Sequence, residues 1–335
     1  FLWGWPLLIL LLGTHLYLTV ILRFPQRYLL KALKLYFVKD HTDKGDISPF
    51  SSLMVALAAN IGAGNIIGVG VAIAAGGPGS IFWCWLTGVL GMATRYSEGL
   101  LAIKYRVENK DGNMSGGPMF VLERGMKCKW LGVLFAVFTA IAAFGIGNLT
   151  QGNAAAEQLY HAFSIPAWGT ATALTALTAL VMLGGIQGIA RVCAFFVPFM
   201  AVLYIFGCVY ILIVQADHIL PAIQCILDCA FTGEAAAGGV VGAAVMTAMR
   251  TGVARGLFSN EAGLGSAAIA SAAAQNRNPV RQALISSSGP FWDTVVICAL
   301  TGIVLTTSII AHPDISCSDG SRLTTLAFSK IPYMG

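Results

Sequence analysis

Charged side chains are scarce in this sequence. Lys, Arg, Asp and Glu make up 10% of its 335 residues, whereas soluble domains contain about 25%. Apolar residues make up 57%, and the mean hydropathy is +0.76. This composition excludes a soluble globular protein and predicts a membrane protein that crosses the bilayer several times. In such a chain a net charge of +5 does not indicate a nucleic-acid partner.

Motifs for metal binding and catalysis are also missing. The eight cysteines show no CxxC spacing, and no HExxH motif occurs. The five histidines fall mostly near the ends of predicted spans, and no pair or cluster of His or Asp lies within one span. We therefore expect no disulfide framework, no Cys or His metal site, no cofactor and no enzymatic activity.

Long apolar runs predict an all-α fold. A helix needs about 20 apolar residues to cross a hydrocarbon layer that is about 30 Å thick. The predicted spans are residues 3–22, 51–75, 81–105, 130–160, 167–183, 192–214, 220–249 and 283–308. Between the first two, leucines interspersed with basic residues over 23–46 indicate an amphipathic helix on the membrane surface.

The second predicted span has a centre that suits a continuous helix poorly. Residues 60–65 read NIGAGN; each glycine weakens a helix by about 1 kcal/mol, and an unpaired amide is costly at membrane depth. One interpretation is a broken membrane helix, in which freed backbone groups hold ions and small anions, as in many secondary transporters. The other is a helix-packing face, because Gly64 and Gly68 form a GxxxG pair. These six residues alone leave both interpretations open.

A second apolar segment, 220–249, is interrupted by glycine near 232–239. The two interrupted segments lie five spans apart and cross in opposite directions, which predicts an inverted five-helix repeat with the site between them. Residues 51–215 would form the first repeat and 220–308 the start of the second, after an extra helix at 3–22. We expect the last three core helices to be missing from this chain.

The basic residues sort to one side of the membrane. Eighteen of the twenty Lys and Arg residues lie in four segments, 23–47, 95–129, 184–191 and 249–281. An excess of Lys and Arg marks cytoplasmic segments, so these four are predicted to be cytoplasmic. We expect a multi-pass protein of the plasma membrane, in contact with lipid and without an obligate protein partner.

Four passages resemble the alanine/glycine:cation symporter family, the sodium:alanine symporters. They are ANIGAGNIIGVGVAI with GGPGSIFW (59–83), SGGPMFVLERG (115–125), AAFGIGNLTQGN (142–153) and RGLFSNEAGLGSA (255–267). The resemblance implies the leucine-transporter fold of the APC superfamily, with five plus five inverted helices. It also implies uptake of alanine, glycine or a similar small amino acid, coupled to sodium or protons, in the inner membrane of a bacterium.

The resemblance also implies site residues. Backbone amides of Ala63, Gly64 and Asn65 would bind the substrate carboxylate, as helix N-termini bind anions. Family members often have Thr where this chain has Ala63, which leaves the preferred substrate open. The remaining candidate substrate contacts are Phe144, Gln151, Thr247, Met249 and Thr251. The candidate cation-binding residues are Ala58, Asn60, Ile61 and Asn65, with carbonyls of Ala58 and Ile61 forming half of a sodium site.

An acidic residue inside the membrane is a functional candidate by default, so Asp228, Glu234 and Asp293 are retained as candidates. Arg95 and Glu98 are predicted to form a structural pair. Sodium is favoured over protons because no side chain in the predicted core titrates near neutral pH at its ordinary pKa. The alternatives are a proton-coupled transporter of the same fold, an ion channel and a non-transporting membrane scaffold.

Overall fold

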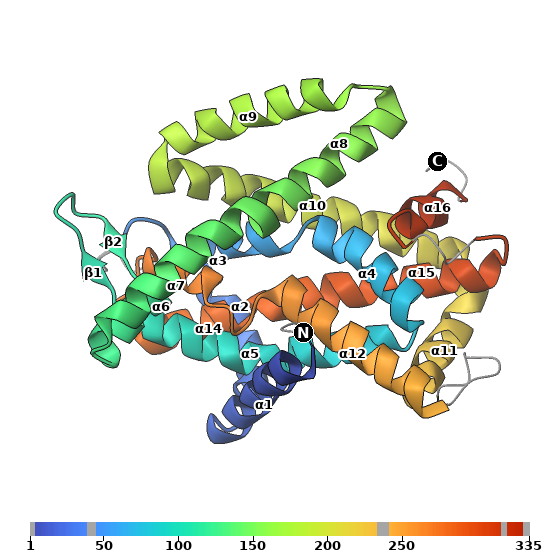
Figure 1. Cartoon of the computed structure of the whole chain (residues 1–335), viewed down its shortest axis with the longest axis horizontal. Coiled ribbons are helices and arrows are strands. Elements are labelled where there is room, and N and C mark those ends of the chain that lie inside the picture. The colour runs from blue at the N-terminus through green and yellow to red at the C-terminus, as the bar shows by residue number, and fades with distance from the viewer. Residues whose placement is uncertain (1–3, 39–44, 233–240, 316–319, 331–335) are drawn as a thin grey trace.

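The computed structural model describes residues 4–38, 45–232, 241–315 and 320–330, which form a bundle of helices and one short hairpin (Figure 1). The first helices are α1 (Trp5–Ile21), η1 (Pro25–Tyr28), α2 (Leu29–Leu35), α3 (Pro49–Asn60), α4 (Ala63–Gly76) and α5 (Ser80–Lys104). Strands β1 (Val107–Glu108) and β2 (Met114–Ser115) pair antiparallel, with Val107 opposite Ser115. The middle of the chain forms α6 (Pro118–Phe120), η2 (Val121–Gly125), α7 (Lys129–Ala142), η3 (Ala143–Leu149), α8 (Thr150–Phe163), α9 (Ala167–Leu183) and α10 (Gly185–Val214).

The last third of the chain is also helical. It forms η4 (Ala216–His218), α11 (Ile219–Phe231), α12 (Val241–Asn260), α13 (Ser266–Ala272), α14 (Pro279–Ser287), η5 (Phe291–Cys298), α15 (Ala299–Ala311) and α16 (Leu323–Ser329). Segments η2, η3 and η5 are π-helical. The predicted all-α membrane architecture is therefore confirmed, whereas the π-helical turns were not predicted.

Four helical stretches of the described chain are long and apolar enough to cross a bilayer. They are Pro49–Gly76, Lys129–Phe163, Gly185–Val214 and Pro279–Ala311. A fifth, Trp5–Ile21 with Pro25–Leu35, is bent by 65°. Among the described residues, the predicted spans at 81–105, 167–183 and 220–249 do not qualify by length and composition, and α9 at 167–183 is too short with 17 residues. Helix α5 has the length, at 25 residues, but it carries buried polar side chains such as Thr87, Thr94 and Arg95.

The predicted break in the second span is present. Helix α3 ends at Asn60 and α4 begins at Ala63, and Ile61 between them has an extended backbone (φ −78°, ψ 107°). The second predicted break, near 232–239, lies almost wholly outside the described residues. Glu234 also lies outside them. Of the two broken segments, the structure therefore shows the first.

Helix α5 lies at the centre of the bundle, where it packs against α1, α12, α13 and α14. Two glycines of α12 allow the closest approach. A Cβ on Gly252 would lie 2.1 Å from the carbonyl oxygen of Ser80, and one on Gly256 would lie 1.8 Å from the Thr87 Oγ1. Small residues of this kind let helix backbones approach closely in membranes. This contact fixes α12 against α5.

Helices α8 and α9 extend away from the central bundle (Figure 1). On α9 the large apolar side chains are exposed, among them Leu177, Leu180 and Leu183, and Thr170 is its one buried residue. Exposed apolar side chains on helices of this length fit contact with lipid.

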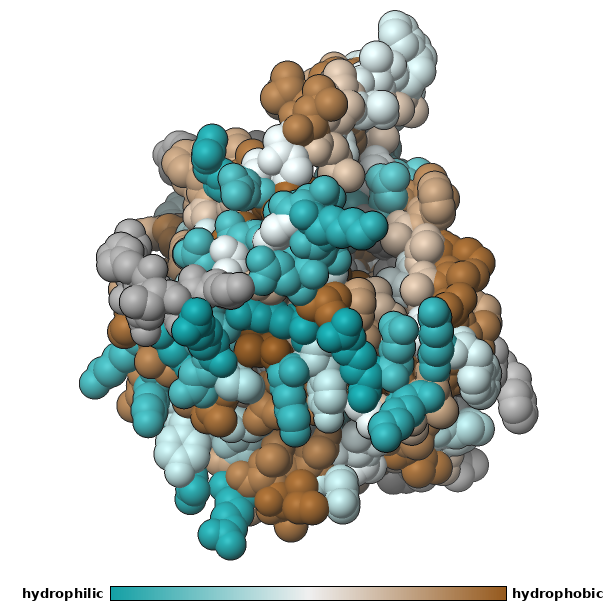
Figure 2. Space-filling model, turned by 90° about the vertical axis from the view of Figure 1, so that its left-hand side faces the viewer, coloured by the Kyte–Doolittle hydropathy of each residue, from teal (hydrophilic) through white to brown (hydrophobic). Residues whose placement is uncertain are grey.

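One end of the bundle is polar. Figure 1 places the β1–β2 hairpin, the α9–α10 junction and α14 at this end, and Figure 2 shows hydrophilic side chains across its middle. Arg106 ties the end together, because its guanidinium donates to the carbonyls of Ala272 (3.0 Å), Ala274 (2.7 Å) and Asn276 (3.0 Å). The backbone of Ile47 also pairs with this segment, since its carbonyl accepts from the amide of Gln275 at 2.7 Å.

We predict that Arg106→Ala destabilises the protein, because three carbonyls lose a charged donor and such a bond contributes about 1.5–3 kcal/mol. Thermal unfolding in detergent can be followed by the reaction of the buried thiols of Cys84, Cys208 and Cys298 with a fluorogenic reagent. Lys110→Ala, at an exposed position of the hairpin turn, is the control. Equal melting temperatures for the two variants would contradict the stabilising role of Arg106.

Candidate functional site

The break between α3 and α4 faces a buried carboxylate. Asn65 lies in the first turn of α4, and its Nδ2 donates to Asp293 twice, to the backbone carbonyl (3.1 Å) and to Oδ1 (2.5 Å). Both side chains are fully buried. Asp293 lies in the π-helical segment η5, a kind of irregularity that is frequent at functional sites. The contact joins residues that are 228 positions apart in the chain.

Two hydroxyl groups complete the environment of Asp293. Its Oδ2 accepts from Ser259 Oγ of α12 at 2.9 Å and from the neighbouring Thr294 Oγ1 at 2.7 Å. The carboxylate thus has hydrogen-bond donors from three helices, α4, α12 and η5. Burying a charge in a membrane protein is costly unless it is compensated, so this set of donors is needed to hold Asp293 in place.

The last residue of α3 also binds α12. Asn60 is buried, and its Nδ2 donates to the backbone carbonyl of Asn260 at 3.1 Å. Its Oδ1 is buried and has no hydrogen-bond partner among the described residues. The Asn260 side chain in turn accepts from the amide of Ala262 at 3.0 Å. Both sides of the break are therefore attached to the C-terminal half of α12.

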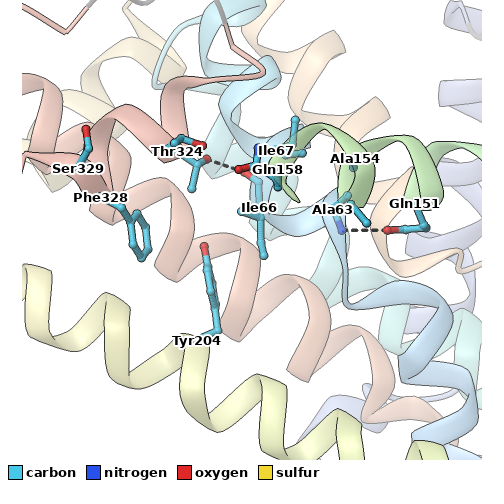
Figure 3. A pocket seen from close by; sticks show the side chains of 12 residues that line it. Ala63, Ile66, Ile67, Gln151, Ala154, Gln158, Tyr204, Thr324, Phe328 and Ser329 are labelled. Atoms are coloured by element: carbon cyan, nitrogen blue, oxygen red, sulfur yellow. Dashed lines mark hydrogen bonds between the residues drawn. The ribbon is translucent and has the colours of Figure 1, made fainter. Parts of the chain in front are cut away.

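The opposite side of the break borders a cavity of about 540 Å³. The amide of Ala63 donates to Gln151 Oε1 of α8 at 3.1 Å, and Thr324 Oγ1 of α16 donates to the carbonyl of Ile66 at 2.8 Å (Figure 3). The cavity is lined by Ala63, Ile66, Ile67, Gln151, Ala154, Ala155, Gln158, Tyr204, Thr324, Thr325, Phe328 and Ser329. It offers a mostly apolar volume beside one polar pair at the start of α4.

The structure brings together some of the predicted site residues. Asn60 and Asn65 meet α12 and η5, and Ala63 and Gln151 meet at the cavity. Ile61 lies in the break itself, and Ala58 precedes it on an exposed part of α3. The fourth predicted substrate residue of this region, Gly64, faces α12 instead of the cavity.

Four other predicted substrate residues lie elsewhere. Phe144 is 75% exposed on η3, because the π-helical turn changes which side chains share a face with Gln151. Thr247 is exposed, and Met249 packs with Leu8 and Val253. Thr251 lies beside Gly76 at the end of α4, which is about 20 Å along the helix from Ala63 by helical rise.

The α12 residues at the break come later in the chain than predicted. They are Arg255, Ser259 and Asn260, because α12 continues to Asn260 and its early turns pack beside the end of α4. A weak signal was present in the sequence, since Arg255 and Ser259 are polar residues four apart and therefore share one face of α12. Asp293 was noted as an intramembrane acid, but no pattern in the sequence pairs it with Asn65.

The remaining acidic residues serve other contacts. Glu98 pairs with Arg95 at 3.4 Å, as predicted, and also accepts from the amides of Gly263 (2.8 Å) and Gly265 (3.2 Å). It thereby fixes the loop that follows α12. Asp228 is exposed on α11. No group of three or more His, Cys, Asp or Glu residues that could hold a metal occurs in the part of the chain that the structure describes.

Comparison with known proteins identifies the family. A sequence model of the sodium:alanine symporter family matches residues 1–334. An uncharacterized transporter of Haemophilus influenzae is 52% identical over 333 residues, which cover 98% of this chain and 72% of that protein. The sodium/alanine symporter AgcS of Methanococcus maripaludis is 48% identical, over 100% of this chain and 75% of its own length.

A third relative, the uncharacterized transporter YflA of Bacillus subtilis, is 39% identical over 338 residues, which cover 100% of this chain and 71% of that protein. The family and its named relatives are transporters and not enzymes, in agreement with the sequence prediction. The match extends over the whole described structure, including the broken helix, α12 and η5. This chain belongs to the sodium:alanine symporter family.

Proposed function

We propose that this protein takes up alanine or a similar small amino acid together with sodium, and that both bind at the break between α3 and α4. The observation that carries the proposal is the buried contact of Asn65 with Asp293, which links the broken helix to a carboxylate inside the membrane. The 48% identity to a protein named as a sodium/alanine symporter supports the choice of ion and substrate.

The cation would bind among oxygen atoms near Asp293. Sodium is a hard cation that prefers carboxylate, carbonyl, hydroxyl and amide oxygens. The carboxylate of Asp293, the hydroxyl of Ser259 and the side chain of Asn65 supply such oxygens within one buried cluster. The unpartnered Oδ1 of Asn60 and the carbonyls of Ala58 and Ile61, on the other side of the break, are the further candidates.

The amino acid would bind where α4 begins. At present Gln151 Oε1 accepts from the amide of Ala63, at a helix N-terminus that favours negative charge. A substrate carboxylate oxygen can accept from the same amide, which would release Gln151 to interact with the substrate ammonium group. The neighbouring side chains of Ile66 and Ile67 would then contact the substrate side chain.

Coupling follows from the position of Asn65. Its side chain belongs to the proposed cation site, and its backbone belongs to the turn that begins with the amide of Ala63. A cation that orders this turn raises the affinity for the carboxylate, and linkage requires that the amino acid raise the affinity for the cation by the same factor.

Alternating access would expose this site to each side of the membrane in turn. The cavity is bordered by α16, which Figure 1 shows at the opposite end of the bundle from the β1–β2 hairpin. The hairpin end holds the predicted cytoplasmic segments and is closed by the contacts of Arg106. We propose that the structure represents an outward-facing state of an inverted five-helix repeat.

The direct test is uptake of radiolabelled alanine and glycine into proteoliposomes containing the full-length protein, with and without an inward sodium gradient. Sodium-dependent uptake supports the proposal. Uptake driven by a proton gradient alone would show that the protein is an amino-acid transporter coupled to protons instead of sodium. The buried carboxylate of Asp293 is compatible with that alternative. Absence of uptake under both gradients would refute the proposed function.

We predict that Asn65→Ala lowers sodium-dependent alanine uptake at least tenfold, because Asp293 loses one of its donors and the turn after the break loses its anchor. Asn153→Ala is the matched control, since Asn153 is exposed on α8 and does not line the cavity at the break. Wild-type uptake by the Asn65 variant, at equal protein content, would place the site elsewhere.

We predict that Gln151→Ala raises the KM for alanine about tenfold, which corresponds to the loss of one charge-assisted hydrogen bond. Binding of radioactive sodium in the absence of alanine should stay unchanged, because Gln151 contacts the α4 amide and not Asp293. A parallel loss of sodium binding would show that Gln151 maintains the fold of the break and does not contact the substrate selectively.

A further inference from the structure

Arg255 occupies a slot on α4 that two glycines create. A Cβ added to Gly68 would lie 2.2 Å from the guanidinium carbon of Arg255, and one added to Gly64 would lie 2.6 Å from Nη2. The GxxxG pair is therefore a packing face, as one interpretation of the sequence suggested, but it receives a charged side chain. No other residue type leaves room for the guanidinium at these two positions.

The guanidinium holds the first turn of α4 through one hydrogen bond. Its Nη2 donates to the carbonyl of Gly64, the residue before Asn65. The ring of Phe258 lies 5.2 Å from the guanidinium carbon, within the range of a cation–π contact. The Nε of Arg255 is buried and has no hydrogen-bond partner among the described residues. A partly buried positive charge thus lies between α12 and α4, with part of its hydrogen-bonding capacity unused.

Arg255 and Asp293 are held by adjacent residues. Gly64 binds the guanidinium, and Asn65, the next residue, binds the carboxylate. On α12, Ser259 follows Arg255 by four residues, so the two side chains share a helix face, and Ser259 donates to Asp293 at 2.9 Å. Two connections therefore link the arginine to the buried aspartate, one through adjacent residues of α4 and one along a face of α12.

We propose that Arg255 is a positioning residue that sets the cation affinity of this transporter by acting as a fixed positive charge beside Asp293. The proposal rests on the function proposed above. An isolated carboxylate at low dielectric would bind a cation tightly, whereas a coupling ion must be released in every cycle. The fixed charge weakens cation binding, and the bond to Gly64 keeps the turn that binds the amino acid in place.

Neutralising the arginine should therefore move two affinities in opposite directions. In Arg255→Gln, the concentration of sodium for half-maximal binding falls by about tenfold, because one positive charge near the site is lost. The KM for alanine rises, because the Gly64 carbonyl loses its charged donor. A variant that is merely unstable lowers both activities together, so the opposed shifts separate the proposed role from a structural one.

Charge and position can be separated with two further variants. Arg255→Lys keeps the charge, so sodium binding should stay within about threefold of wild type while the alanine KM rises.

Gly68→Ala fills the slot and should impair alanine uptake in the wild-type background. In the Arg255→Gln background the same alanine should add no further defect, since the guanidinium that it would displace is absent. Gly13→Ala, where a Cβ meets nothing within 4 Å, is the control.

The experiment measures binding of radioactive sodium to the purified full-length protein and alanine uptake in proteoliposomes. Tighter sodium binding by Arg255→Gln, with wild-type-like sodium binding by Arg255→Lys, is the expected result. Unchanged or weaker sodium binding by Arg255→Gln, in protein with wild-type melting behaviour, would overturn the proposal, and so would an additive effect of Gly68→Ala in that background. If Arg255→Gln does not fold, weaker sodium binding by Arg255→Lys would overturn it. Failure of the wild type to bind sodium would instead refute the proposed function itself.

Discussion

The structure depends on the contact between a broken helix and a buried carboxylate. Interrupting a helix inside a membrane leaves backbone groups without partners, and burying an aspartate leaves a charge without water. Asn65 and Asp293 resolve both problems together, since the amide of the first binds the carboxylate and a carbonyl of the second. The two irregular segments, the α3–α4 break and the π-helical η5, therefore stabilise each other.

Helix α12 arranges the remaining parts around this contact. One of its faces presents Gly252 and Gly256 to α5, and another presents Arg255 and Ser259 to α4 and η5. Its last residue, Asn260, accepts from Asn60 on the far side of the break. The segment 255–260, which begins the RGLFSNEAGLGSA passage, is thus the place where α3, α4 and η5 meet α12.

Much of the fold could be predicted because it follows from local patterns. Glycine and asparagine within an apolar run indicated the break, and the predicted span 167–183 matches α9 at both ends. The site was harder to predict, because its contacts join distant segments and depend on helical register. Thr247, Met249 and Thr251 were placed at the break although α12 reaches it two turns later, and the π-helical turn at Ala143–Leu149 removed Phe144 from the face of Gln151. Asp293 stood out in the sequence as an acid within an apolar span, but its partner Asn65 could not be predicted.

The glycine face of α12 has a consequence for how sequence variation maps onto activity. Gly252 and Gly256 contact neither the cavity nor Asp293, yet they determine how close α12 lies to α5 and so where Arg255 and Ser259 are held. A larger residue at either position would push α12 away from α5 as a rigid body, and Arg255 and Ser259 would move with the helix. If the proposed cation site is correct, a substitution at either glycine would change ion affinity without any contact with the ion or with Asp293.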